Sequence, residues 1–176
     1  MKTQAFLLAA AMVLHGQTPM KKGDTMKTSK QADLEIVLER QFPAPLSAVF
    51  DSLTQAKHIV HWMKPANMSL VTCEVDLREG GRFRYVFQRG GGATIEVRGT
   101  YEKVEPPRFV AYTETYDFSP LKVLVATTLE DSGSGTRFKQ TLKYASKQER
   151  DDDYEGVATS AADAFGNLEQ YLAAKR

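Results

Sequence analysis

Most of this chain consists of short segments in which apolar and polar residues alternate, separated by turns rich in glycine and proline. The clearest is 82–88, where Phe83, Tyr85 and Phe87 share one face. A period of two is typical of a β-strand that buries one side. The three glycines at 90–92 then indicate a hairpin turn. The chain is therefore expected to build an antiparallel sheet whose aromatic side packs inward.

Strands are expected at 34–40, 69–77, 82–88, 94–104, 108–118, 122–130 and 136–144. Two short helices should follow the first strand, at 46–53 and 55–63, because Pro45 suits the first turn of a helix and Pro65 ends one. Regularly spaced strands joined by such turns predict one antiparallel meander.

The last segment has helical instead of strand periodicity. Residues 148–153 are polar and mostly acidic, which favours the positive N-terminal end of a helix dipole. An apolar stripe follows, made of Val157, Ala161, Ala164, Phe165, Leu168, Tyr171 and Leu172. We expect an α+β helix-grip domain over 34–174, with a curved antiparallel sheet of about seven strands around this long C-terminal helix.

The N-terminal region, 1–33, is expected to be an unstructured lead-in to that domain. Its apolar run, 5–14, has the length of a signal-peptide core and is too short to span a bilayer. An alternative places the true start at Met26, because codons for 22–24 can resemble a ribosome-binding site. We favour Met26 and a cytoplasmic protein; export is the alternative.

Charge and cysteine content narrow the classes of partner. The 176 residues carry a net charge of +1, so no strong field attracts nucleic acid or an acidic membrane. The single cysteine, Cys73, excludes an internal disulfide, and we interpret it as a buried structural thiol. The chain is expected to act as a monomer or homodimer.

No catalytic or metal-binding set is recognisable. His58 and His61 share a helix face, but zinc needs three or four ligands, so neither a metal nor another cofactor is predicted. Ser134 lies in a turn between strands, and the glycine runs precede strands instead of a helix, which argues against a nucleophile elbow or a phosphate loop. An enzymatic role therefore lacks named residues.

A gap between a concave sheet and a helix is a common site for an apolar ligand. The candidate cavity residues are Trp62, Phe83, Tyr85, Phe87, Arg98, Tyr112, Glu114, Phe118, Phe165 and Leu168. Glu96 and Arg98 share one strand face, and Tyr112, Glu114 and Tyr116 share a face of the next. We favour the solvent side for both faces, because polar residues are routine there. If these faces point inward instead, their side chains would make the cavity polar.

The order of several motifs resembles the SRPBCC or START-like superfamily, in the subgroup similar to the activator of the ATPase of the 90-kDa heat-shock chaperone. The motifs are Phe42-Pro43-Ala44-Pro45, His61-Trp62-Met63-Lys64-Pro65, Asp76-Leu77-Arg78-Glu79-Gly80-Gly81-Arg82-Phe83, Gly99-Thr100-Tyr101 and Pro106-Pro107-Arg108-Phe109-Val110. The resemblance spans 34–174 and implies the helix-grip fold. It says less about function, because this fold hosts many functions. Ala161 stands where many members carry tryptophan, and we expect a larger cavity beside it.

Three functions remain open. The first is binding of a hydrophobic or amphipathic small molecule between sheet and helix, which the sequence favours. The second, implied by the resemblance, is a chaperone-associated interaction module with a role in stress response that binds through the outside of the domain. The third is a cyclase-like or hydrolase-like enzyme that uses the same cavity.

Overall fold

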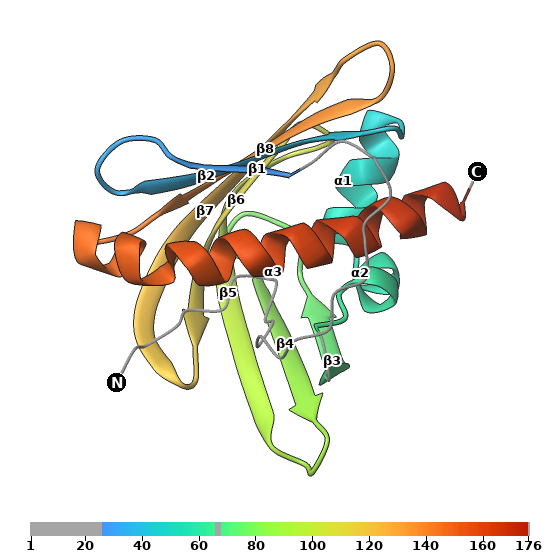
Figure 1. Ribbon diagram of the computed structural model, residues 1–176. Helices are drawn as coiled ribbons and strands as arrows, with labels where there is room; N and C mark the ends of the chain where they lie inside the picture. Colours follow the sequence, from blue (N-terminus) through green and yellow to red (C-terminus); the bar gives the residue numbers. More distant parts are fainter. Residues whose placement is uncertain (1–25, 66–67, 176) are drawn as a thin grey trace.

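An eight-stranded antiparallel sheet curves around one long helix in the computed structural model, which describes residues 26–65 and 68–175 (Figure 1). The strands are β1 (Lys27–Lys30), β2 (Glu35–Phe42), β3 (Met68–Val75), β4 (Arg82–Arg89), β5 (Thr94–Glu105), β6 (Phe109–Tyr116), β7 (Ser119–Asp131) and β8 (Thr136–Lys143). Their order is β1-β2-β8-β7-β6-β5-β4-β3. The helices are α1 (Leu46–Thr54), α2 (Ala56–Trp62) and α3 (Lys147–Ala173). The predicted helix-grip fold is confirmed.

The sheet has one strand more than expected, because β1 lies within the predicted lead-in. The expectation of an unstructured segment is wrong for Lys27–Lys30, which pair with β2. This strand is polar, so it shows no apolar alternation, and its anchors come from α3. The Tyr154 hydroxyl donates to the Thr28 carbonyl at 3.2 Å, and Lys30 pairs with Asp151 at 2.6 Å. The predictions for 1–25, including the signal peptide, lie outside the described residues.

Helix α3 begins with a complete capping box. The Ser146 hydroxyl accepts from the Glu149 backbone N–H, and the Glu149 carboxylate accepts from the Ser146 N–H, both at 3.2 Å. These bonds satisfy donors that a helix start would otherwise leave unpaired. Of the helices within the described ranges, none is long and apolar enough to cross a membrane.

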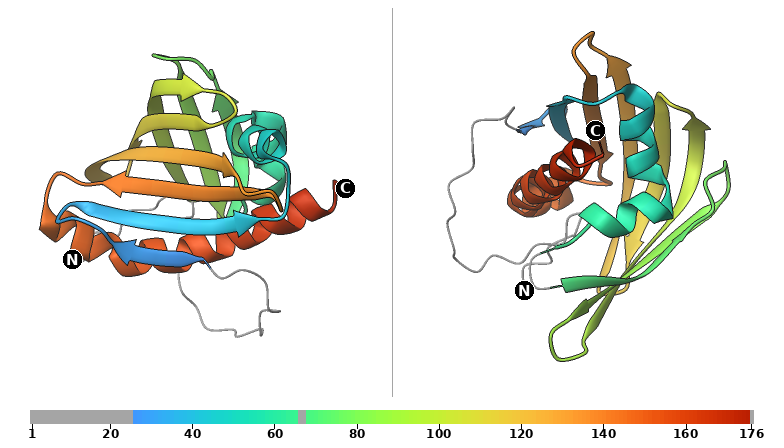
Figure 2. Two further views of the ribbon diagram at one scale, coloured as in Figure 1. Left: turned by 90° about the horizontal axis from the view of Figure 1, so that it is seen from above. Right: turned by 90° about the vertical axis from the view of Figure 1, so that its right-hand side faces the viewer.

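The three helices enclose the concave side of the sheet together. Helix α3 lies across this side, while α1 and α2 close one end (Figure 2). Val157, Ala161 and Leu168 of α3 are fully buried, as the apolar stripe predicts. Trp62 at the end of α2 stacks near Phe165 of α3, with ring centroids 6.4 Å apart. The space between sheet and helices is thus a core shared by all three helices.

Gly99 of β5 makes room for an aromatic ring on the inner face. Any Cβ at this position would overlap the ring of Phe83 and the carbonyl oxygen of Thr113. Gly99 pairs with Phe83 of β4 on one side and with Glu114 of β6 on the other. A glycine here therefore lets Phe83 lie flat against the neighbouring strand.

We expect Gly99→Ala to destabilise the protein by about 1–3 kcal/mol, because the added methyl group has no space. Gly166→Ala on α3 is the matched control, since nothing lies within 4 Å of a Cβ there. That change should stabilise the helix by about 0.5–1 kcal/mol. Urea unfolding of both variants measures the difference, and equal effects of the two would contradict the packing described for Phe83.

Candidate functional site

A small internal cavity lies between the sheet and the three helices. Its wall is formed by Leu53, Thr54, Trp62, Phe83, Tyr85, Tyr101, Val110, Tyr112, Thr127, Gln140, Ala164 and Phe165. The cavity volume is about 30 Å³. That is room for one or two water molecules, whereas pockets for drug-sized ligands measure roughly 300–1,000 Å³. The side chains of the core nearly fill the gap that the architecture predicts.

One polar pair interrupts the aromatic wall. The Gln140 amide donates to the Thr127 hydroxyl at 3.0 Å across β8 and β7. Both side chains are buried. The amide oxygen of Gln140 is also buried and accepts no hydrogen bond from any residue that the structure describes. A buried acceptor without a donor costs free energy, so this wall favours a guest that can donate a hydrogen bond.

Three tyrosines, Tyr85, Tyr101 and Tyr112, form part of the wall of the same cavity. Burial raises the pKa of Tyr85 and Tyr112 well above the ordinary value, and raises that of Tyr101 as well. All three phenols therefore stay protonated over the physiological pH range and can donate hydrogen bonds. The cavity is apolar in its ring surfaces and polar at a few fixed points.

A second polar group lies farther along the inner face, at Glu114 and Tyr116 of β6. Glu114 is fully buried, and one of its carboxyl oxygens accepts from the Tyr116 hydroxyl. Its other oxygen has no hydrogen-bond partner among the described residues. Burial raises the pKa of Glu114 to about 8, and the nearby Asp153 carboxylate adds to the rise. Asp153 of α3 accepts from the Tyr144 hydroxyl at 2.7 Å.

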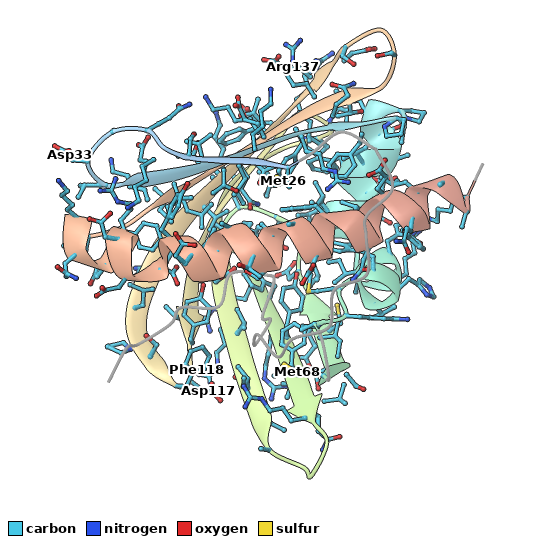
Figure 3. All side chains as sticks on the ribbon, in the orientation of Figure 1. Met26, Asp33, Met68, Asp117, Phe118 and Arg137 are labelled. Carbon is cyan, nitrogen blue, oxygen red and sulfur yellow. The ribbon has the colours of Figure 1, made fainter. Side chains whose placement is uncertain are left out.

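Five of the ten predicted residues line the cavity: Trp62, Phe83, Tyr85, Tyr112 and Phe165. Phe87, Glu114 and Leu168 are buried without lining it. Phe118 lies outside, at the turn between β6 and β7 (Figure 3), where 40% of its surface is exposed. Its placement in the cavity was wrong, because the strand ends at Tyr116 and its alternation stops there.

Arg98 also lies on the wrong side for a cavity residue. It pairs with Arg84 and Thr115 on the outer face, and 66% of its side chain is exposed. The expectation of a solvent side was right for Glu96 and Arg98 but wrong for Tyr112, Glu114 and Tyr116. The register between β5 and β6 explains why the two groups lie on opposite sides of the sheet. Glu114 pairs with Gly99 and not with Arg98, and paired residues share a face.

The histidines and the cysteine have structural partners. Tyr171 of α3 contacts His58 through a 2.8 Å hydrogen bond and stacks on His61 at 5.4 Å between ring centroids. No group of three or more metal-ligating side chains occurs in 26–65 and 68–175. Cys73 is half-buried, and burial raises its thiol pKa to about 11, which suppresses the reactive thiolate.

The larger cavity expected beside Ala161 is absent from the described structure. Ala161 is fully buried, yet the cavity wall includes Ala164 instead, and its volume is small. Phe165 fills part of the space, since its ring packs 4.7 Å from that of Phe138 and 6.3 Å from that of Phe42. A small residue on the helix is thus compensated by aromatic rings around it.

Several buried polar residues are not among the predicted site residues. Thr127, Gln140, Arg40, Tyr144 and Asp153 are all buried. The burial of Thr127 and Gln140 could have been predicted from their strands. Each lies two positions from an apolar residue, Val125 or Leu142, and residues two apart on a strand share a face.

A family model described as Activator of Hsp90 ATPase homolog 1-like protein matches residues 43–173. The comparison with curated proteins finds no match.

Solved structures of three bacterial proteins are similar. A Rhodobacter sphaeroides protein superposes with a TM-score of 0.83 and 24% identity, covering 86% of this chain and 99% of its own. A Nitrosomonas europaea protein has a TM-score of 0.76 and 24% identity over 85% of this chain and 100% of its own. An AHSA1-like protein from Aeromonas hydrophila has a TM-score of 0.68 and 20% identity, covering 81% and 94%. These likenesses support the fold.

The buried carboxyl group predicts a pH dependence of stability. The pKa of Glu114 rises from an ordinary value of 4.5 to about 8 on folding, so the folded state keeps a proton that the unfolded chain loses. Stability should fall as the pH increases from about 4.5 to 8. The Glu114→Gln variant cannot ionise at this position. Relative to it, the free energy of unfolding of the natural protein should fall by about 2 kcal/mol or more between pH 5.5 and 8.5.

Urea unfolding at pH 5.5, 7.0 and 8.5 measures this difference. Glu155→Gln, at an exposed carboxylate of α3 that forms no ion pair with any described residue, serves as the control for the loss of one acidic group. A stability difference between the natural protein and Glu114→Gln that stays constant with pH would contradict a buried protonated Glu114.

Proposed function

The chain belongs to the family of activator of Hsp90 ATPase homolog 1-like proteins, and we propose that it binds a small hydrophobic or amphipathic molecule between sheet and helices. The site is the cavity described above. Its occupant would bury apolar surface against Trp62, Phe83 and Phe165, which is the main driving force for such binding.

The unsatisfied amide oxygen of Gln140 is the observation that supports this proposal most. This oxygen lies in a cavity wall made mostly of aromatic and aliphatic side chains, and the hydrogen bond from the Gln140 amide to Thr127 holds it in place. A ligand with a hydroxyl or N–H group would pair with this oxygen and remove the cost of leaving it bare. A few fixed polar groups in an apolar wall are typical of small-molecule sites.

The volume of the cavity sets a condition on binding. An engineered cavity of about 150 Å³ accepts benzene, so a site of about 30 Å³ must expand to hold even one aromatic ring. Expansion requires rotation of the wall side chains or displacement of α3, which contributes Ala164 and Phe165. The ligand must therefore offset the free energy of opening, and affinity should increase with the apolar area that it buries.

Thermal unfolding with a series of probes tests the proposal. Phenol, 2-naphthol and 1-decanol offer a hydroxyl donor with apolar bodies of different size, and toluene has a similar shape to phenol without a donor. A probe at ten times its dissociation constant should raise the melting temperature by about 3–6 °C. Toluene should raise it less than phenol does, because it leaves the Gln140 oxygen unpaired.

Ala164→Leu provides the blocking variant, since its longer side chain projects into the cavity wall. Ala162→Leu, at a half-exposed position of the same helix, is the matched control. Binding in the cavity predicts that the first variant loses the thermal shift and the second keeps it. No shift with any probe, or equal shifts in both variants, would argue against this function.

A further inference from the structure

The outer face of the sheet carries a row of charged residues on neighbouring strands. The register aligns Glu74 of β3, Arg84 of β4, Arg98 of β5, Thr115 of β6 and Lys122 of β7. Adjacent strands are about 4.8 Å apart, so the row from Arg84 to Lys122 extends over roughly 14 Å. This row lies on the side of the sheet opposite the helices.

The adjacent row adds a further cation and two hydroxyl groups. Arg82 pairs with Thr100, which in turn pairs with Thr113. Together the two rows line a shallow groove of about 490 Å³ on the outer face. We call it the outer groove.

Two arginines of the outer groove stand directly opposite each other. Arg84 and Arg98 form one cross-strand pair, and like charges in that arrangement repel. Glu96 compensates: one carboxylate oxygen accepts from Arg84 at 2.9 Å, and the other accepts from Arg98. These two bonds lower the pKa of Glu96 and keep it charged. A single carboxylate thus holds two guanidinium groups side by side, which neutralises only one of the two positive charges.

Two further cations, Arg82 and Lys122, increase the excess of positive charge in the outer groove. Neither Arg82 nor Lys122 forms an ion pair with any residue in 26–65 or 68–175, and both are exposed. Glu74 lies 3.7 Å from Arg84. The outer groove therefore carries two more positive charges than negative ones, although the whole chain has a net charge of only +1.

We propose that the outer groove binds an acidic, extended segment of a partner protein. An extended peptide advances about 3.4 Å per residue, so carboxylates at positions i and i+4 are about 14 Å apart. That separation matches the distance from Arg84 to Lys122. A carboxylate at i+2 falls between them, near Arg98 and the Thr115 hydroxyl. A nucleic acid is the less suitable occupant, because the phosphate backbone requires a longer positive surface than a chain of net charge +1 provides.

Fluorescence anisotropy with a labelled Glu-Ser-Glu-Ser-Glu peptide tests this proposal at low salt. The natural protein should bind it, and the affinity should fall as salt is added, because exposed charges are screened. Arg82→Glu combined with Lys122→Glu should weaken binding about tenfold or more. Both residues are exposed and lack ion pairs, so the variant should fold normally, which its unfolding temperature checks.

The matched control is Lys57→Glu combined with Lys139→Glu, which changes the net charge equally at two exposed lysines of α2 and β8 outside the groove lining. This variant should bind the acidic peptide within twofold of the natural protein. A Gln-Ser-Gln-Ser-Gln peptide should not bind. The proposal is overturned if the acidic peptide does not bind, if both double variants weaken it equally, or if single-stranded RNA binds more tightly.

Discussion

The fold depends on how one amphipathic helix covers a strongly curved sheet. Helix α3 buries Val157, Ala161 and Leu168 against the inner face, and α1 and α2 close only one end. A single stripe of such residues cannot fill the concave volume, so long aromatic side chains from the strands extend into it. The rings of Phe83, Tyr101 and Tyr112 lie within 6.0 Å of one another, centroid to centroid. Packing, and not the backbone alone, sets the size of the cavity.

This way of filling the interior explains its polar groups. A tyrosine supplies a large ring but also brings a hydroxyl group that needs a partner when buried. Tyr116 and Tyr144 satisfy theirs with the carboxyl groups of Glu114 and Asp153. The carboxyl groups in turn are placed where water cannot reach them, and this raises the pKa of Glu114. The acidic group under α3 is thus a consequence of an aromatic core that carries hydroxyl groups.

Sequence periodicity predicted the three helices, every strand except β1, and the inner face of β4. Phe83, Tyr85 and Phe87 alternate with polar residues, so their burial could be predicted. The register between strands could not be predicted, because alternation within one strand does not show which residue of the neighbouring strand lies opposite a given residue. For this reason Arg98 and Glu114 were grouped as candidates, although they lie on opposite sides of the sheet.

Strand β1 and the Gln140–Thr127 pair escaped prediction for a related reason. The residues of β1 are polar on both sides, and their pairing depends on anchors from α3, more than a hundred positions along the chain. Gln140 and Thr127 are polar residues buried because a partner strand supplies the hydrogen bond. Contacts between segments far apart in the chain determine both the pairing of β1 and the burial of Gln140 and Thr127, and these contacts cannot be inferred from a single sequence.

The cavity and the outer groove share one residue, which links the two faces of the sheet. Phe83 lines the cavity and also borders the groove beside Gly99, where no side chain intervenes. The ring of Phe83 is buried on the inner face against Gly99, so the groove is bordered here by the strands and not by the ring. A guest in the cavity would reach the groove only by shifting β4 and β5 at the Phe83–Gly99 pair. Coupling between the two sites, which is equal in both directions, would require that shift.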